Sequence, residues 1–206
     1  MGLALLSIVA NRLRLEHTAQ RVAALVTPRP PRENSEPAAE RRTLSEACAA
    51  AGVPYPPPDV RIVVEKSLRR LTLLSGARPI IRYRVGLGFA PSDNKAREGD
   101  GRTPEGELRV VTRNEKSRFR RFLGLSYPRP ADITQGAVTL DERASIERAF
   151  RDGTQPPWET PLGGAVGIHG HGGSSDWTSG CIALDDAAID LLWEAVPLGT
   201  PVRVVP

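Results

Sequence analysis

A glycine-rich loop that carries a thiol and two imidazoles constrains this chain more than any other feature. It runs from Gly167 to Leu184 and holds Cys181, one of two cysteines in the chain, together with two of the three histidines. Apolar residues stand at both ends of the loop, which is typical of short buried strands. A fold that accommodates this stretch has to double the loop back and bring the cysteine close to a histidine.

The loop pairs a nucleophile with a candidate base. A free thiol has a pKa of about 8.5 and is mostly protonated at neutral pH, so it needs a base nearby. We interpret Cys181 as the nucleophile and His169, twelve residues earlier, as its base. His171 is the rival base or a substrate-binding donor. Gly180 lets the backbone approach a substrate carbonyl, and its amide together with that of Cys181 would form an oxyanion hole.

Two separated motifs resemble one known family. Residues 168–170 (Ile-His-Gly) followed by residues 179–184 (Ser-Gly-Cys-Ile-Ala-Leu) resemble the signature of L,D-transpeptidase (YkuD-type) catalytic domains. Residues 98–106 are similar to a G-x-x-x-T-P-x-G segment of the same family. The resemblance covers residues 59–206. The chain departs from the family pattern in a shorter loop, in having no residue between serine and glycine of the motif, and at Ala183, where an arginine is common.

The resemblance implies a fold and an activity. The fold is mainly β, an L,D-transpeptidase-like β-sandwich with two peripheral helices, preceded by a Pro-rich N-terminal extension. The activity is acyl transfer at Cys181 on peptidoglycan stem peptides through an acyl-thioester, in cell-wall crosslinking or remodelling and hence in cell shape. A stem-peptide donor, an amine acceptor and a carbapenem adduct are the implied partners, and no cofactor is expected. Family members often orient the imidazole with a backbone carbonyl. This substrate implies the periplasm or cell envelope.

Three alternatives stay open. A hydrolase or amidase of the same fold would trim wall peptides, with water in place of the amine. A non-catalytic wall-binding module would use the loop for recognition alone. A zinc protein would hold the metal with His169, His171 and Cys181, and Asp176 would add a fourth ligand. Asp176 otherwise orients the imidazole or caps a turn in the loop.

Further residues are candidate substrate contacts. Ser179 either donates to the substrate or holds the loop, and Trp177 either lines an acyl pocket or packs under the loop. Arg102 either forms an internal ion pair with Asp100 or Glu105, or binds a substrate carboxylate. Together with His171, these three residues form the expected substrate-binding set.

The overall charge excludes few classes of partner. The chain has 206 residues, a net charge of +4 and a pI near 9.5, with both signs interspersed. The basic cluster at 118–121 is interpreted as a solvated face or as a surface that attracts an anionic polymer. No helix-turn-helix, finger or RNP-like motif is present, which argues against a nucleic-acid partner. Cys48 lies in an Ala-rich helical pattern and is expected to be buried and not disulfide-bonded to Cys181.

Three regions follow one another along the chain. Residues 1–26 form an apolar and amphipathic segment, for which an export signal, a weak membrane anchor and a soluble helix stay open. Its apolar run is half of the about 20 residues that a membrane span needs. Residues 27–58 are a Pro-rich linker with a short helix over 43–51, which begins with a capping box. Residues 59–206 are the expected catalytic domain.

Apolar periodicity predicts the elements of this last region. Strands are expected at 60–64, 71–74, 79–88, 108–112, 122–127 and 202–205, with a long loop over 89–106. Helices are expected at 141–151 and 185–196, the second with Asp185 as its N-cap.

Overall fold

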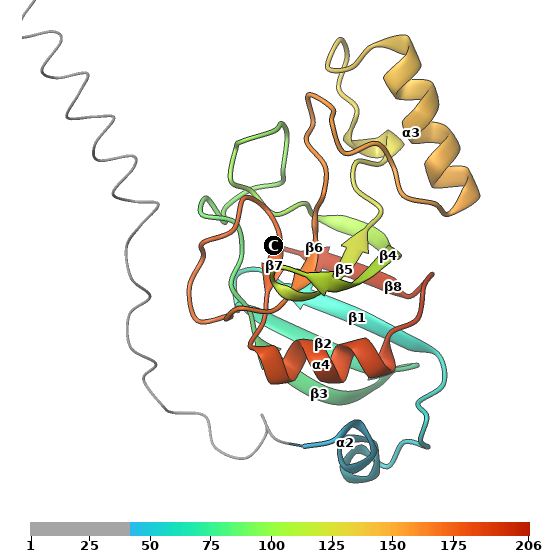
Figure 1. The fold of residues 1–206 in the computed structure, drawn as a ribbon, viewed down its shortest axis with the longest axis vertical. Coiled ribbons are helices and arrows are strands. Elements are labelled where there is room, and N and C mark those ends of the chain that lie inside the picture. The colour runs from blue at the N-terminus through green and yellow to red at the C-terminus, as the bar shows by residue number, and fades with distance from the viewer. Residues whose placement is uncertain (1–41) are drawn as a thin grey trace, which may run out of the picture. The chain divides into compact units, whose positions relative to one another are not determined.

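The computed structural model describes residues 42–206, which form a curled eight-stranded sheet with three α-helices (Figure 1). The strands are β1 (Val60–Glu65), β2 (Arg70–Ser75), β3 (Arg78–Arg84), β4 (Gly106–Ser117), β5 (Arg120–Leu125), β6 (Gly167–His169), β7 (Ile182–Ala183) and β8 (Pro201–Val205). Their order across the sheet is β3-β2-β1-β8-β4-β5-β6-β7. The predicted mainly β fold is confirmed.

The two ends of this strand order meet beside the glycine-rich loop. Just after β3, Gly86 exchanges backbone hydrogen bonds of 3.0 and 2.8 Å with Ala183 of β7. An added Cβ at Gly86 would lie 2.1 Å from the carbonyl oxygen of Ser175, so no larger residue fits this crossing. The layers expected of a sandwich are therefore parts of one sheet that curls back on itself, and the loop lies at its closure.

The helices begin and end where capping residues stand. Helix α2 (Leu44–Ala51) has the predicted capping box between Thr43 and Glu46 and ends at Gly52, whose φ is 63°. Helix α3 (Leu140–Asp152) begins one residue earlier than predicted, because Thr139 forms a second capping box with its third residue, Glu142. Helix α4 (Asp186–Ala195) has Asp185 at the N-cap, as predicted, although its side chain forms no capping hydrogen bond. A short 3₁₀ helix, η2, covers Pro130–Asp132.

Helix α2, which was expected within the 27–58 segment, packs into the same core as the sheet. Leu44, Ala47 and Cys48 are buried and belong to the main hydrophobic cluster. Both Cys48 and Cys181 are free thiols, as expected. The folded unit therefore begins before the polyproline stretch at 54–58.

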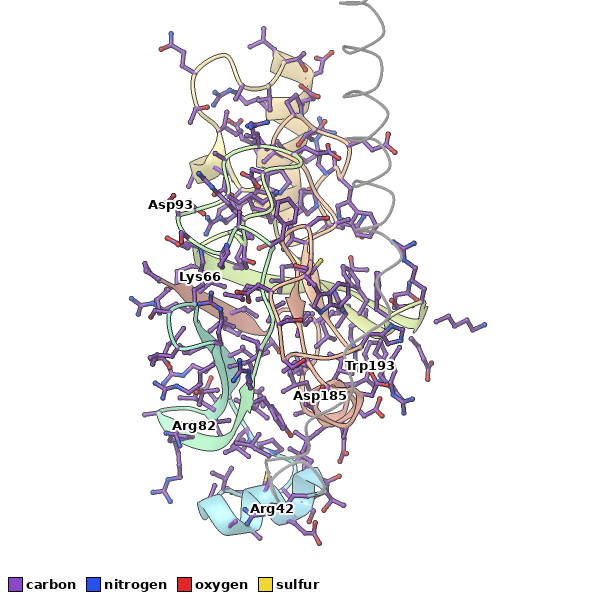
Figure 2. The ribbon with its side chains drawn as sticks, turned by 90° about the vertical axis from the view of Figure 1, so that its left-hand side faces the viewer. Arg42, Lys66, Arg82, Asp93, Asp185 and Trp193 are labelled. Atoms are coloured by element: carbon purple, nitrogen blue, oxygen red, sulfur yellow. The ribbon has the colours of Figure 1, made fainter. Side chains whose placement is uncertain are left out.

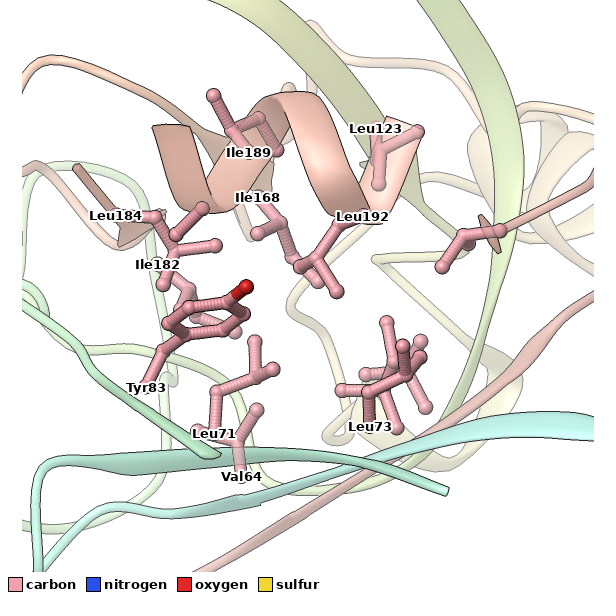
Figure 3. Packing of buried hydrophobic residues seen from close by; sticks show 14 of the residues in the cluster. Val64, Leu71, Leu73, Tyr83, Leu123, Ile168, Ile182, Leu184, Ile189 and Leu192 are labelled. Atoms are coloured by element: carbon pink, nitrogen blue, oxygen red, sulfur yellow. The ribbon is translucent and has the colours of Figure 1, made fainter. Parts of the chain in front are cut away.

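The core lies between the curled sheet and α4 (Figure 3). From the sheet side come Val64, Leu71 and Leu73, and from α4 come Ile189 and Leu192, which face them across the core in Figure 3. Removing such side chains from water is the main stabilising contribution to a fold of this size. The predicted apolar stripe of α4 is confirmed.

Strand limits differ from the sequence-based expectation by one or two residues in several strands and by more in β3 and β4. Strand β4 extends to Ser117 because it pairs with β8 over its first part and with β5 over the rest. Strand β3 ends at Arg84, since the continuation to 88 forms only isolated bridges. Residues 1–26 and the start of the 27–58 segment lie outside the described residues. Within 42–206, no helix is long and apolar enough to cross a membrane.

Candidate active site

The register of β6 and β7 brings the predicted thiol and imidazole to one face of the sheet. The two strands are parallel neighbours, with Ile168 opposite Ile182 and His169 opposite Ala183. Cys181 stands two residues before Ala183, so strand alternation turns its side chain to the same side as that of His169. Extending this register by one residue places Cys181 opposite Gly167, whose amide contacts the thiol, two residues before His169 on β6.

His169 is held in one orientation and one tautomer. Its side chain is buried, and Nδ1 lies 2.8 Å from the carbonyl oxygen of Gly170. A carbonyl oxygen only accepts, so Nδ1 carries the proton and Nε2 keeps its lone pair. A backbone carbonyl therefore holds the imidazole, in the way that the family resemblance implied.

Both reacting groups are neutral near pH 7. Burial lowers the pKa of His169, against the opposing effect of the Gly170 carbonyl. Burial raises the pKa of the Cys181 thiol to about 11, against the opposing effects of the Gly167 amide and the Lys95 ammonium. The thiol donates a long hydrogen bond of 3.5 Å to the Ala165 carbonyl. In the resting state both the thiol and the imidazole are therefore uncharged.

Gly180 is required by its surroundings. Its φ is +139°, and an added Cβ would lie 2.7 Å from the carbonyl oxygen of Arg102. Its N–H is already bonded to Thr178 Oγ1 at 3.1 Å, and the Thr178 hydroxyl donates to the Cys181 carbonyl at 2.7 Å. The Gly180 amide, which was expected to be an oxyanion donor, is thus bonded within the loop in this structure, and its role in an oxyanion hole stays a prediction. The neighbouring Cys181 N–H is the other expected donor of this oxyanion hole.

An aromatic wall, formed by Phe119, Trp177 and His171, surrounds the imidazole. Phe119 stacks on His169 with ring centroids 4.6 Å apart and an angle of 25°, and Trp177 meets it edge-on at 5.5 Å. Trp177 donates to the Gly172 carbonyl at 3.0 Å and is 39% exposed, so one face remains open. The exposed His171 ring meets the Phe119 ring edge-on, with the two ring centroids 5.7 Å apart. The Phe119 and Trp177 rings restrain the imidazole of His169, and the open face of Trp177 leaves an apolar surface exposed next to it.

Asp176 anchors the loop instead of contacting the imidazole. Its carboxylate accepts from the Arg69 guanidinium at 2.8–3.1 Å and from the Leu87 N–H at 2.9 Å. This charged pair ties the glycine-rich loop to the segments flanking β2 and β3. Among the residues that the structure describes, no group of three or more His, Cys, Asp or Glu side chains is arranged to hold a metal ion.

The 93–106 loop is held by ion pairs that differ from the predicted ones. Lys95 pairs with Asp100 at 2.9 Å, and Lys66 pairs with Glu105 at 2.7 Å. The Arg102 guanidinium instead lies 3.5 Å from Asp93, so the expected pairing of Arg102 with Asp100 or Glu105 is wrong. Both lysine side chains are buried at 3% exposure, whereas that of Arg102 is 36% exposed. Lys66 also donates to the Asp93 carbonyl, and both residues are labelled in Figure 2.

The remaining candidates lie at the mouth of the site. Ser179 is exposed and stands two residues before the nucleophile, and Arg102 is partly exposed beside the Gly180 backbone. Sequence reasoning missed Phe119, because the surrounding arginines at 118–121 indicated only a basic turn. It also missed Lys95, which is buried next to Gly180 and carries no local motif.

Comparison with known proteins places this arrangement in a family. The model of the L,D-transpeptidase catalytic domain matches residues 59–204. No curated protein sequence matches the chain.

Solved structures share the fold at low sequence identity. The helical cell shape determining protein Pgp2 from Campylobacter jejuni is 20% identical, with a TM-score of 0.52 over 78% of this chain and 53% of that one. The L,D-transpeptidase from Xylanimonas cellulosilytica is 15% identical, with a TM-score of 0.44 over 80% of this chain and 70% of that one. The chain therefore spans about half the length of the Campylobacter protein, and the likeness extends to the fold.

Proposed function

The chain belongs to the L,D-transpeptidase catalytic domain family, and from this premise we propose that it is a cysteine acyltransferase acting on peptidoglycan stem peptides. The observation that carries the proposal is the placement of Cys181 on the face that also carries His169, with the Nδ1 proton of the imidazole bonded to a carbonyl. That arrangement leaves Nε2 as the base for a thiol that needs one.

The first half-reaction forms an acyl-thioester. His169 Nε2 takes the thiol proton as Sγ attacks the carbonyl carbon of an amide between an L- and a D-centre. A carbon–sulfur bond forms, and the Cys181 N–H donates to the oxyanion. The carbon–nitrogen bond then breaks, and the imidazolium returns its proton to the departing D-amino acid. Because both groups start neutral, proton transfer accompanies the attack.

The second half-reaction resolves the thioester. The amine of an acceptor stem attacks the thioester carbonyl, His169 accepts the amine proton, and Sγ leaves with that proton. The product is a 3→3 crosslink or a bond between a protein and the wall. Substrate contacts are proposed at the mouth, where Trp177, His171, Ser179 and Arg102 are exposed or partly exposed. The location that fits this substrate is the periplasm or cell envelope.

Product analysis with a tetrapeptide stem tests the proposal. We expect loss of the terminal D-amino acid together with a crosslinked dimer when an amine acceptor is present, and neither product with Cys181→Ala. Loss of the D-amino acid without dimer, at high acceptor concentration, would make the protein a hydrolase of the same chemistry. An unchanged stem with folded wild-type protein would contradict the proposed function.

A further inference from the structure

We propose that Asp186 is a positioning residue for His169, acting through the peptide group that joins Gly170 to His171. The inference rests on the proposed role of His169 as the base. Asp186 is the first residue of α4, and the sequence analysis assigned it no role. It does not touch the imidazole, so its effect has to pass through the backbone.

One peptide group connects the carboxylate to the imidazole. The N–H of His171 donates to Asp186 Oδ1 at 2.8 Å, and the carbonyl oxygen of Gly170 accepts from His169 Nδ1 at 2.8 Å. These N–H and carbonyl atoms belong to the same planar amide. Asp186 therefore fixes the orientation of this peptide group. The carbonyl of the same peptide group in turn fixes the orientation of the imidazole ring.

The surrounding backbone leaves this peptide little freedom. The preceding amide, Gly170 N–H, donates to the Phe119 carbonyl at 3.0 Å. An added Cβ at Gly170 would lie 2.7 Å from Asp186 Oδ1 and 3.0 Å from that same carbonyl oxygen. His171 has a φ of 73°, a region that residues other than glycine seldom adopt. The hydrogen bond to Asp186 compensates for this uncommon conformation.

The carboxylate also makes the Gly170 carbonyl a better acceptor. An amide whose N–H is bonded to an anion is polarised, so its oxygen carries more negative charge. That charge favours the imidazolium that forms when His169 takes the thiol proton. Other charged or titratable groups facing this region are His171 on the loop and Arg118, whose guanidinium lies 4.7 Å from the centre of the Phe119 ring. Arg120 of β5 is near Asp186, and both Arg120 and Arg121 pair with Asp190 of α4. Arg120 is thus partly neutralised, and the carboxylate retains its influence.

Two substitutions at Asp186 separate positioning from charge. Asp186→Ala removes both, and we expect the rate constant of acylation by the carbapenem imipenem, followed by intact mass, to fall about 10- to 100-fold. Asp186→Asn keeps an oxygen acceptor for the His171 N–H, and we expect it to restore the rate to within about threefold of wild type. The neighbouring Asp185→Ala is the matched control, because Asp185 forms no side-chain capping bond, and we expect it to retain the wild-type rate.

Nuclear magnetic resonance of the His169 ring measures its tautomer and its pKa, and so tests the inference independently of turnover. In wild type we expect the Nδ1–H tautomer, and in Asp186→Asn and Asp186→Ala a lower pKa for His169, because the imidazolium loses a stabilising charge. Thermal melting checks that all variants are folded. A wild-type acylation rate and an unchanged imidazole pKa in folded Asp186→Ala would overturn the inference while leaving the proposed function intact. A wild type that does not react would count against the proposed function, and the imidazole titration would still decide the inference.

Discussion

The two sides of the site are built with different chemistry. On one side, His169 lies against Phe119 and Trp177, and peptide groups supply its hydrogen bonds. On the other side, the 93–106 loop buries charges in pairs, with Lys95 and Asp100 only 3% and 7% exposed. Burial on the aromatic side lowers the pKa of His169, whereas the ionic side holds the backbone next to Gly180 and Cys181.

The contact between the two sides explains why both are needed. Gly180 lies directly against the Arg102 carbonyl of the ionic loop, and the next residue is Cys181. Removing one partner of a buried, hydrogen-bonded ion pair is strongly destabilising. The buried ion pairs therefore hold the Arg102 carbonyl in place more firmly than surface contacts would. We therefore expect the ionic side to contribute mostly to stability, and the aromatic side mostly to the rate of the proposed reaction.

The largest expected effect is on stability, from the ionic side. Lys95→Met leaves Asp100 buried without its cation, which costs about 3–5 kcal/mol of unfolding free energy. Chemical denaturation measures this loss. Lys116→Met, the same change at an exposed position of β4, is the matched control and should change stability by less than about 0.5 kcal/mol. Equal effects of the two substitutions would remove the distinction between the two sides.

The next effect falls where the sides meet. Gly180→Ala places a methyl group 2.7 Å from the Arg102 carbonyl at a φ of +139°, and the resulting shift of Cys181 should slow acylation about 100-fold. Gly136→Ala controls for backbone strain, because Gly136 has a φ of +76° and open space around its Cβ position. Stopped-flow or intact-mass kinetics report the rates. If the two variants acylate equally fast, the crowding at Gly180 has no role in placing the nucleophile.

On the ionic side, acid sensitivity between about pH 4 and pH 2 is expected from Asp100. Burial raises the pKa of Asp100, but hydrogen bonds from Lys95 and from the Ala96, Arg102 and Arg97 amides outweigh it and lower the pKa to about 2. Because the folded-state pKa lies below the unfolded one, this carboxylate stabilises the protein above about pH 4, by about 2 kcal/mol, and the contribution is lost as the pH falls towards 2.

Urea denaturation from pH 5 to pH 2 tests this window. Wild type should lose the contribution across it, and Asp100→Asn should show a flatter pH dependence over the same range. Parallel curves for the two proteins would show that Asp100 does not govern acid stability.

The smallest expected effect comes from the aromatic side. Phe119→Ala removes the ring that stacks on His169 and should lower the acylation rate about tenfold, or about 1.4 kcal/mol in the barrier. Phe150→Ala, at an exposed position of α3, is the matched control. The rate of imipenem acylation at pH 7 is the measurement. A rate loss in Phe119→Ala that is matched by Phe150→Ala would mean that the stacking does not hold the base.

Local signals in the sequence predicted much of this structure. The capping box at Thr43 and the 3-4 spacing of Ile189 and Leu192 depend on neighbours only a few residues away, so they could be read directly. The return of the glycine-rich loop, which makes β6 and β7 neighbours, was also predictable, because a loop between two buried strands has to come back to its start.

Long-range partners could not be predicted in the same way. Lys95 and Lys66 take the acids that Arg102 was expected to pair with, and their choice depends on how deep each side chain lies. Asp186 contacts the loop through a single backbone N–H, a contact that leaves no residue pattern. Curling of one sheet likewise depends on a crossing at Gly86 and Ala183 that no periodicity records.

Intact mass after incubation with imipenem tests the central claim most directly, namely that Cys181 is an activated acyl-accepting thiol. We expect one adduct on wild type and none on Cys181→Ala. Cys48→Ala should also carry one adduct, because Cys48 is buried in the core away from the loop. An adduct that persists in Cys181→Ala, or a folded wild type that remains unmodified, would contradict it.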